Sequence, residues 1–144
     1  SLRAFAIEAD AQRLARLERN AVQLGAPGVS AVHGRAPEAL EGLPPPDAAF
    51  IGGGLGHGDL LDRVWDALRP GGRLVANAVT LEGERCLGEA WERFGGELDR
   101  IAVSHGARIG RRHALRPAMP VTQWYATKPR QARPDAVTDE EDRS

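Results

Sequence analysis

The chain has 144 residues, of which 42% are hydrophobic, and a formal net charge of −1. This length allows one domain with a real core. No apolar run approaches the length of a membrane span, which argues against a membrane protein. The single Cys86 excludes an internal disulfide, so the composition fits a reducing, cytoplasmic compartment.

The first part of the chain alternates short apolar runs with amphipathic segments. Leu2 to Ile7 and Val29 to His33 read as strands, and Asp10 is expected to cap the helix between them. The apolar positions of that helix are Leu14, Leu17, Ala21 and Leu24, and Gly25 and Pro27 are expected to end it.

The middle of the chain repeats this alternation with more apolar strands. Asp47 to Ile51 reads as a buried strand, and Asp59 is expected to start a helix that buries Leu60, Leu61, Val64, Trp65 and Leu68. Pro70-Gly71-Gly72 stops that helix and turns the chain into a buried strand, Arg73 to Val79. Thr80 should then cap a helix that runs to Phe94.

Strands that alternate with helices predict an α/β fold with a parallel sheet and right-handed crossovers. The last two strands, 97–104 and 121–127, have no helix between them, so they should pair antiparallel at the sheet edge, joined by a long Arg-rich loop. We expect one domain over residues 1–128. The polar tail, 129–144, reads as disordered.

Candidate site residues follow strands, because ligands of open α/β sheets bind at the carboxyl ends of strands. Glu8 is placed to accept hydrogen bonds from ribose hydroxyls, although a solvated loop acid is the alternative. Gly34-Arg35-Ala36 follows the next strand, where an adenine ring would lie. Gly52, Gly53 and Gly54 allow close approach of a ligand to the backbone. Asn77, Thr80 and Glu82 lie at the carboxyl end of the strand over residues 73–79, and His57 is either an acid or base or a plain loop histidine.

Three segments carry a family resemblance: Phe50-Ile51-Gly52-Gly53-Gly54, Leu68-x-Pro70-Gly71, and Val75-x-Asn77-Ala78-Val79-Thr80-Leu81-Glu82. The Ile7-Glu8 and Gly34-x-Ala36-Pro37 positions also fit. Over roughly Ala4 to Lys128 the chain resembles the decarboxylating precorrin methyltransferases of cobalamin biosynthesis, in particular the C-terminal, carbon-15-methylating domains of the precorrin-6Y enzymes.

The resemblance implies a class I (Rossmann-like) methyltransferase fold, S-adenosylmethionine as donor, and a carboxylate-rich precorrin tetrapyrrole as acceptor. It implies methylation of carbon 15 coupled to decarboxylation of the carbon-12 acetate arm. Glu8, Gly34, Arg35, Ala36, Gly52 and Gly53 would then contact the donor. Gly54 and His57 would contact the acceptor, and Asn77, Thr80 and Glu82 would orient the macrocycle for the reaction. Relatives of this kind form tetramers, so a homo-oligomer is expected, without a metal, a membrane or nucleic acid.

The chain departs from the family pattern at two places. Arg35 stands where relatives often carry Asp, which removes a side-chain contact to the adenine amino group. The family's first strand and its glycine-rich loop have no counterpart in these residues, and they would precede Ser1. That strand is central in the family's sheet, so the Leu2–Ile7 strand is expected to lack a partner that joins it to Phe50-Ile51.

The segment from Ile101 to Pro134 has no acidic residue and carries Arg108, Arg111, Arg112 and Arg116, with His105 and His113. Arginine pairs bidentately with carboxylates, so Arg108 and Arg111 are predicted to bind acetate and propionate arms of the acceptor. A solvated or subunit-contact loop is the alternative for this segment. For the whole chain the alternatives are a class I RNA methyltransferase, which would use the arginines on phosphates, and a non-catalytic oligomerisation fragment.

Overall fold

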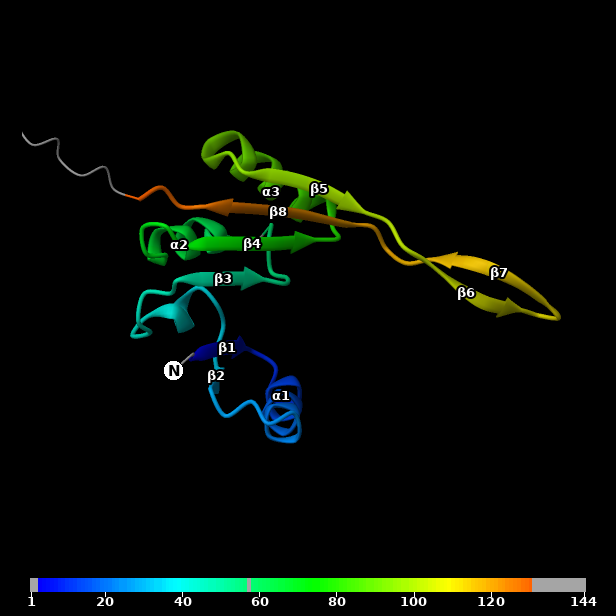
Figure 1. The fold of residues 1–144 in the computed structure, drawn as a ribbon, viewed down its shortest axis with the longest axis horizontal. Helices are drawn as coiled ribbons and strands as arrows, with labels where there is room; N and C mark the ends of the chain where they lie inside the picture. The colour runs from blue at the N-terminus through cyan, green and yellow to red at the C-terminus, as the bar shows by residue number, and fades with distance from the viewer. Residues whose placement is uncertain (1–2, 57, 131–144) are drawn as a thin grey trace, which may run out of the picture.

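The computed structural model describes residues 3–56 and 58–130 (Figure 1). His57 and most of the tail, 131–144, lie outside the described residues. The elements in chain order are β1 (Ala4–Glu8), α1 (Ala11–Gln23), β2 (Val29–His33), the 3₁₀ helix η1 (Glu38–Leu40), β3 (Ala48–Ile51), α2 (Leu60–Ala67), β4 (Arg73–Ala78), α3 (Leu81–Phe94), β5 (Glu97–Ile101), β6 (Ser104–Ile109), β7 (Arg112–Pro117) and β8 (Val121–Thr127).

The strands form an α/β arrangement with parallel pairs and an antiparallel end, as predicted. β1 pairs with β2 and β3 pairs with β4, both in parallel. β8 lies between β4 and β5 and is antiparallel to both, which gives the order β3-β4-β8-β5. Among the strands of residues 3–56 and 58–130, none joins β1 to β3, so the expected gap between these two strands is present.

Side-chain caps begin α1 and α3 where the sequence predicts them. Asp10 accepts a hydrogen bond from the backbone N–H of Arg13, and the hydroxyl of Thr80 accepts one from the N–H of Gly83. The prediction that Leu24 packs inward was wrong. The helix ends at Gln23, and Leu24 is its C-cap residue with 82% of its surface exposed.

One face of the four-stranded sheet is covered by α2 and α3. Alternate β4 residues, Leu74, Ala76 and Ala78, are buried on this face, as the period of two along a strand requires. Trp124 of β8 is fully buried at the centre of the same layer. The predicted inward residues of α2 are all buried: Leu60, Leu61, Val64, Trp65 and, at its C-cap, Leu68.

The expected Arg-rich loop is instead a β-hairpin, and here the prediction was wrong. β6 and β7 pair antiparallel, with Arg108 opposite His113 and His105 opposite Arg116. The short turn at Gly110-Arg111 sets this local pairing, with Gly110 at φ 58°. Because side chains alternate between faces, Arg108 lies on one face of the hairpin and Arg116 on the other. Figure 1 shows the hairpin projecting away from the body of the molecule, beyond the carboxyl ends of β3 and β4.

Lys128, the only lysine of the sequence, follows β8 and closes the C-terminal end of α2. Its ammonium group donates hydrogen bonds to the carbonyl oxygens of Trp65, Asp66 and Leu68 at 2.9, 3.0 and 3.0 Å. These carbonyls lack helical partners, and a positive charge is favourable at the negative end of the helix dipole. One side chain therefore fastens the end of β8 to the end of α2.

We predict that Lys128→Met lowers the free energy of unfolding by about 1.5–3 kcal/mol, since it removes charge-assisted hydrogen bonds to partly buried carbonyls. Chemical denaturation monitored by circular dichroism measures the change. The matched control is Arg69→Met, which removes an ion pair to Asp47 whose side chains are 54% and 82% exposed. This control should cost less than about 1 kcal/mol. Equal losses in both variants would contradict the capping role of Lys128.

Candidate active site at the carboxyl ends of the strands

The ends of β1 and β2 bring the candidate donor-binding residues together. Glu8 lies opposite His33 in the parallel register, and the N–H of Gly34 donates to the carbonyl of Glu8 at 3.2 Å. The Glu8 carboxylate is held at the strand end, because one oxygen accepts from the N–H of Asp10 at 2.9 Å. Arg35 is exposed and Ala36 packs partly against the core. This arrangement holds the Glu8 carboxylate, a hydrogen-bond acceptor, close to the backbone of Gly34, which carries no Cβ.

The glycine loop after β3 packs against the first turn of α3. A Cβ built on Gly56 would lie 2.7 Å from the Cβ of Glu82, and Leu55 of the same loop is buried in the core. Gly53, in contrast, has nothing within 4 Å of its Cβ position. The loop is therefore anchored at 55–56, next to Glu82, while the Cβ position of Gly53 is open to a ligand.

Asn77 points to the face of the sheet opposite α2 and α3, since its neighbours Ala76 and Ala78 are buried beneath the helices. Its side-chain oxygen accepts a hydrogen bond from the Gln123 amide at 2.9 Å. Gln123 lies directly opposite Asn77 in the β4–β8 register. The pair fixes the Asn77 amide at the carboxyl end of β4, with hydrogen-bonding capacity to spare on both side chains.

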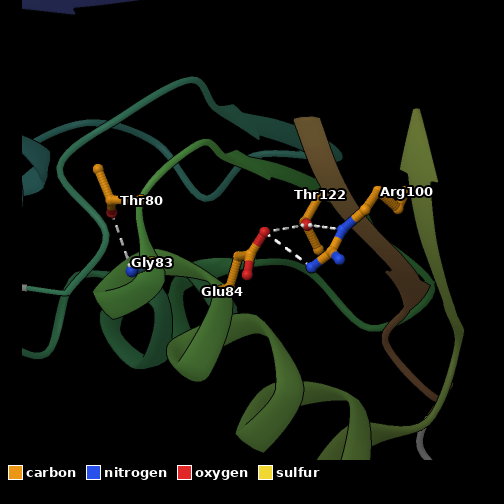
Figure 2. Close-up of polar contacts among 5 residues, drawn as sticks. All are labelled: Thr80, Gly83, Glu84, Arg100 and Thr122. Atoms are coloured by element: carbon orange, nitrogen blue, oxygen red, sulfur yellow. Dashed lines mark hydrogen bonds and ion pairs between the residues drawn. The ribbon is translucent and has the colours of Figure 1, made fainter. Parts of the chain in front are cut away.

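The first turn of α3 places Thr80 and Glu82 at the same edge. The Thr80 hydroxyl accepts from the Gly83 N–H at 3.1 Å, so it retains its own proton for donation. Glu82 is exposed. In the same turn, Glu84 binds Arg100 and Thr122, as Figure 2 shows. A helix N-terminus with an exposed carboxylate and a hydroxyl can orient a polar ligand at this edge.

The structure does not bring the candidate acceptor-binding arginines to this edge. Arg108 and Arg111 lie on the projecting hairpin, and both are exposed (Figure 1). Arg111 occupies the turn between β6 and β7. Gly54, by contrast, lies in the β3 loop that packs on α3. Within a single copy, then, the glycine loop and α3 form one group of candidate residues and the hairpin arginines form another.

A surface hollow of about 520 Å³ lies on the open face of the four-stranded sheet. It is lined by Phe50, Val75, Tyr125 and the first residues of β3 and β4, so it lies toward the amino ends of those strands, away from the candidate residues. A hydrogen bond to Glu97 raises the pKa of the Tyr125 phenol.

No group of three or more His, Cys, Asp or Glu residues in the described ranges is arranged to hold a metal ion. None of the helices in those ranges is both long and apolar enough to cross a membrane.

Burial raises the pKa of the Cys86 thiol, and the negative charge of Glu89 acts in the same direction. A thiol with a raised pKa is largely protonated near neutral pH and is a poor nucleophile. Cys86 also packs against the hydrophobic core, which fits a structural role.

Sequence reasoning missed Gln123 and the contacts of Glu84 with Arg100 and Thr122. The signal that could have indicated Gln123 is its polarity within the apolar alternation of β8. The Glu84 contacts join residues 16 and 38 positions apart, from three elements, and no local pattern reports such a meeting.

A model of the precorrin methyltransferase domain matches residues 1–128. The chain belongs to the precorrin methyltransferase family. One relative in this family, a precorrin-6Y C(5,15)-methyltransferase [decarboxylating] of Sinorhizobium sp, is 48% identical over 128 residues, which are 89% of this chain and 31% of the relative. The chain thus spans about a third of the length of that precorrin methyltransferase.

Solved structures of precorrin methyltransferases have the same fold. The targeted domain of a putative precorrin-6Y C5,15-methyltransferase from Corynebacterium diphtheriae is 39% identical, with a TM-score of 0.82 over 88% of this chain and 75% of that chain. The C-terminal domain of precorrin-6Y C5,15-methyltransferase from Rhodobacter capsulatus is 43% identical, with a TM-score of 0.81 over 88% and 68% of the two chains. The predicted class I methyltransferase fold is therefore confirmed.

We predict that Gly56→Ala destabilises the domain by at least about 1 kcal/mol, because φ is 97° at this position and the new Cβ would meet Glu82. Gly53→Ala is the matched control. Its Cβ position is empty, so its free energy of unfolding should stay within about 0.5 kcal/mol of the wild type. Thermal melts of both variants make the comparison. A normal melting temperature for Gly56→Ala would show that the loop is not anchored on α3.

Proposed function

We propose that this chain is the S-adenosylmethionine-dependent unit that methylates carbon 15 of a precorrin, coupled to loss of the carbon-12 acetate carboxyl group. The main support is that the glycine loop packs against the first turn of α3 at the carboxyl ends of β3 and β4. The chain also belongs to the precorrin methyltransferase family. In open α/β sheets this edge is where ligands bind. We propose residues 1–128 as the methyltransferase unit and 129–144 as a tail without a catalytic role.

The donor-side residues fit S-adenosylmethionine, which supplies the methyl group when bound. Glu8 accepts hydrogen bonds from the ribose hydroxyls, and Gly34, Arg35 and Ala36 line the adenine side with backbone groups. The open Cβ position of Gly53 supports close approach of the donor to the loop backbone at Gly52 and Gly53. Methyl transfer demands chiefly that the sulfonium methyl and the nucleophilic carbon be held in line, so positioning is the main contribution of these residues.

The acceptor-side residues extend from the edge of the sheet to the hairpin. Asn77, Thr80 and Glu82 orient the macrocycle through hydrogen bonds, and Gly54 leaves room for it. Arg108 and Arg111 bind its carboxylate arms. His57 is part of this proposal on the sequence alone. The projection of the hairpin from the body suits a large acceptor that reaches from the sheet edge to the arginines.

We further propose that the protein is a homo-oligomer, specifically a tetramer, in the cytoplasm. A two-stranded hairpin alone is at best marginally stable in water. This hairpin and its root expose Ile109, Leu115 and Met119 at 54%, 73% and 66% of their surfaces. Contact with another copy would cover them. The free Cys86 fits a reducing compartment.

The two alternatives explain less of the geometry. An RNA methyltransferase would use the hairpin arginines on phosphates, and membership in the precorrin methyltransferase family favours a tetrapyrrole instead. A non-catalytic oligomerisation module would have no need for a polar edge with an oriented Glu8 and an amide pair at Asn77.

A paired experiment separates the donor side from the acceptor side. In the full-length protein, Glu8→Ala should weaken S-adenosylmethionine binding by about 1–3 kcal/mol and leave acceptor binding unchanged. Arg108→Ala or Arg111→Ala should weaken acceptor binding by about 1.5–3 kcal/mol and leave donor binding unchanged. Lysine at the arginine positions should rescue binding in part, because it keeps the charge and loses the bidentate geometry. Calorimetric titrations with each ligand measure both effects.

The control for Glu8 is Glu18→Ala, an exposed acid on α1, which should bind both ligands normally. Titrations with a short RNA at two salt concentrations test the RNA alternative. That alternative expects small, similar losses from every arginine, each lowering the salt slope by about one. Tight RNA binding without tetrapyrrole binding would overturn the proposed function.

The oligomer is tested by sedimentation of the full-length protein. We expect a tetramer, and we expect Leu115→Gln to shift it toward smaller species by removing an apolar contact. Val22→Gln is the matched control, since Val22 is 81% exposed on α1, remote in sequence from the hairpin. A monomeric wild type, or equal behaviour of the two variants, would contradict the hairpin contact.

A further inference from the structure

The root of the β6–β7 hairpin is tied to the helix that carries the candidate catalytic edge. The chain leaves the sheet after Ile101, the last residue of β5, and re-enters it at Val121, the first residue of β8. Arg100 and Thr122 lie one residue inside these two points and are opposite each other in the β5–β8 register. Both side chains reach Glu84, which lies in the first turn of α3 (Figure 2).

The hydrogen bonds of this cluster have a defined direction. An ionised carboxylate can only accept, so the Thr122 hydroxyl must donate to Glu84 Oε1, at 2.8 Å. The same hydroxyl oxygen accepts from Arg100 Nε at 3.4 Å, and Arg100 Nη2 donates to Glu84 Oε1 at 2.9 Å. The three side chains thus form a closed set of contacts across α3, β8 and β5, which we name the root clamp.

Burial decides which bond of the root clamp matters most. Thr122 has only 6% of its surface exposed, and the Glu84 side chain is 25% exposed. The Arg100 side chain is 62% exposed, so solvent weakens its ion pair with Glu84. A hydrogen bond from a buried hydroxyl to a charged carboxylate is among the stronger ones in a protein. The Thr122–Glu84 bond therefore contributes most of the clamp, and Arg100 adds to it.

We propose that Glu84 and Thr122 are positioning residues that fix the direction of the hairpin relative to the first turn of α3. Thr80 caps that turn through Gly83, one residue before Glu84 (Figure 2). Glu82 lies within the same turn. The clamp therefore sets the spacing between the edge bearing Asn77, Thr80 and Glu82 and the arm bearing Arg108 and Arg111. This inference rests on the proposed function for its effect on acceptor binding, but the fixed direction of the hairpin does not.

Spin-label distances test the direction of the hairpin without any substrate. In the full-length protein, with Cys86→Ser and other cysteines removed, labels are placed at Glu92→Cys on α3 and His113→Cys on β7. Labelled protein is diluted with unlabelled protein so that distances within one chain dominate. We expect a narrow distance distribution in this background, and a clearly broader one after Thr122→Val, which removes the hydroxyl at nearly constant shape. Thr122→Ser, which keeps the hydroxyl, should restore the narrow distribution.

Glu84→Ala is the second variant, since it removes the acceptor from a helix position that alanine favours. It should broaden the distribution as Thr122→Val does. Glu89→Ala, the same change at an exposed position of the same helix, should not. Unchanged distributions in both Thr122→Val and Glu84→Ala would overturn the proposal.

Steady-state kinetics then test the link to the reaction. Without the label sites, Thr122→Val should raise KM for the precorrin acceptor by about tenfold, because the hairpin arginines are then held less firmly in position, with KM for the donor unchanged. Thr122→Ser should have the wild-type KM. A broadened distance distribution with an unchanged acceptor KM would support the clamp and contradict the acceptor role of the hairpin. A rise in both KM values, with distances unchanged, would overturn the clamp.

Discussion

The burial of one indole ring organises the half of the molecule that carries the proposed acceptor side. Trp124 is fully buried, and its N–H donates to the carbonyl of Gly95 at 2.9 Å, so its polar atom is satisfied. Its ring lies 5.7 Å from that of Trp65 and 6.2 Å from that of Phe94. The residue thus joins β8, α2 and the end of α3 in one contact, and it holds β8 between β4 and β5.

The two halves of the described structure differ in how their side chains are buried. Every buried hydrophobic residue lies between Ile51 and Ala126, while α1 has none and β1 and β2 reach only partial burial. The first turn of α3 therefore rests on a packed core, which suits a group that must hold a reacting carbon in line. Glu8 and the ends of β1 and β2 rest on less packing, and the Gly34–Leu40 segment connects them to the core through Ala36 and Leu40.

The sequence predicted features that arise from local periodicity and missed those that arise from meetings between distant segments. The buried face of α2, the caps at Asp10 and Thr80, and the antiparallel pairing of β5 with β8 followed from apolar spacing and turn chemistry. The β6–β7 hairpin did not, because its residues carry no apolar alternation and its exposed faces give no signal of burial. The Glu84–Thr122 contact depends on the position of β8 between β4 and β5, and the spacing of residues along the sequence does not indicate that position. The roles of the candidate site residues remain predictions.

The contacts of Lys128 also determine how this domain responds to lysine-directed chemistry. All other basic side chains of the sequence are arginine or histidine, so acylating reagents and enzymes that modify lysine find a single ε-amine in the chain. That amine is occupied by three carbonyl groups at the end of α2. Modification competes with these three hydrogen bonds, and the acylated side chain can no longer close the helix end with a positive charge. The reactivity of this one lysine therefore reports on the contact between the end of β8 and the end of α2.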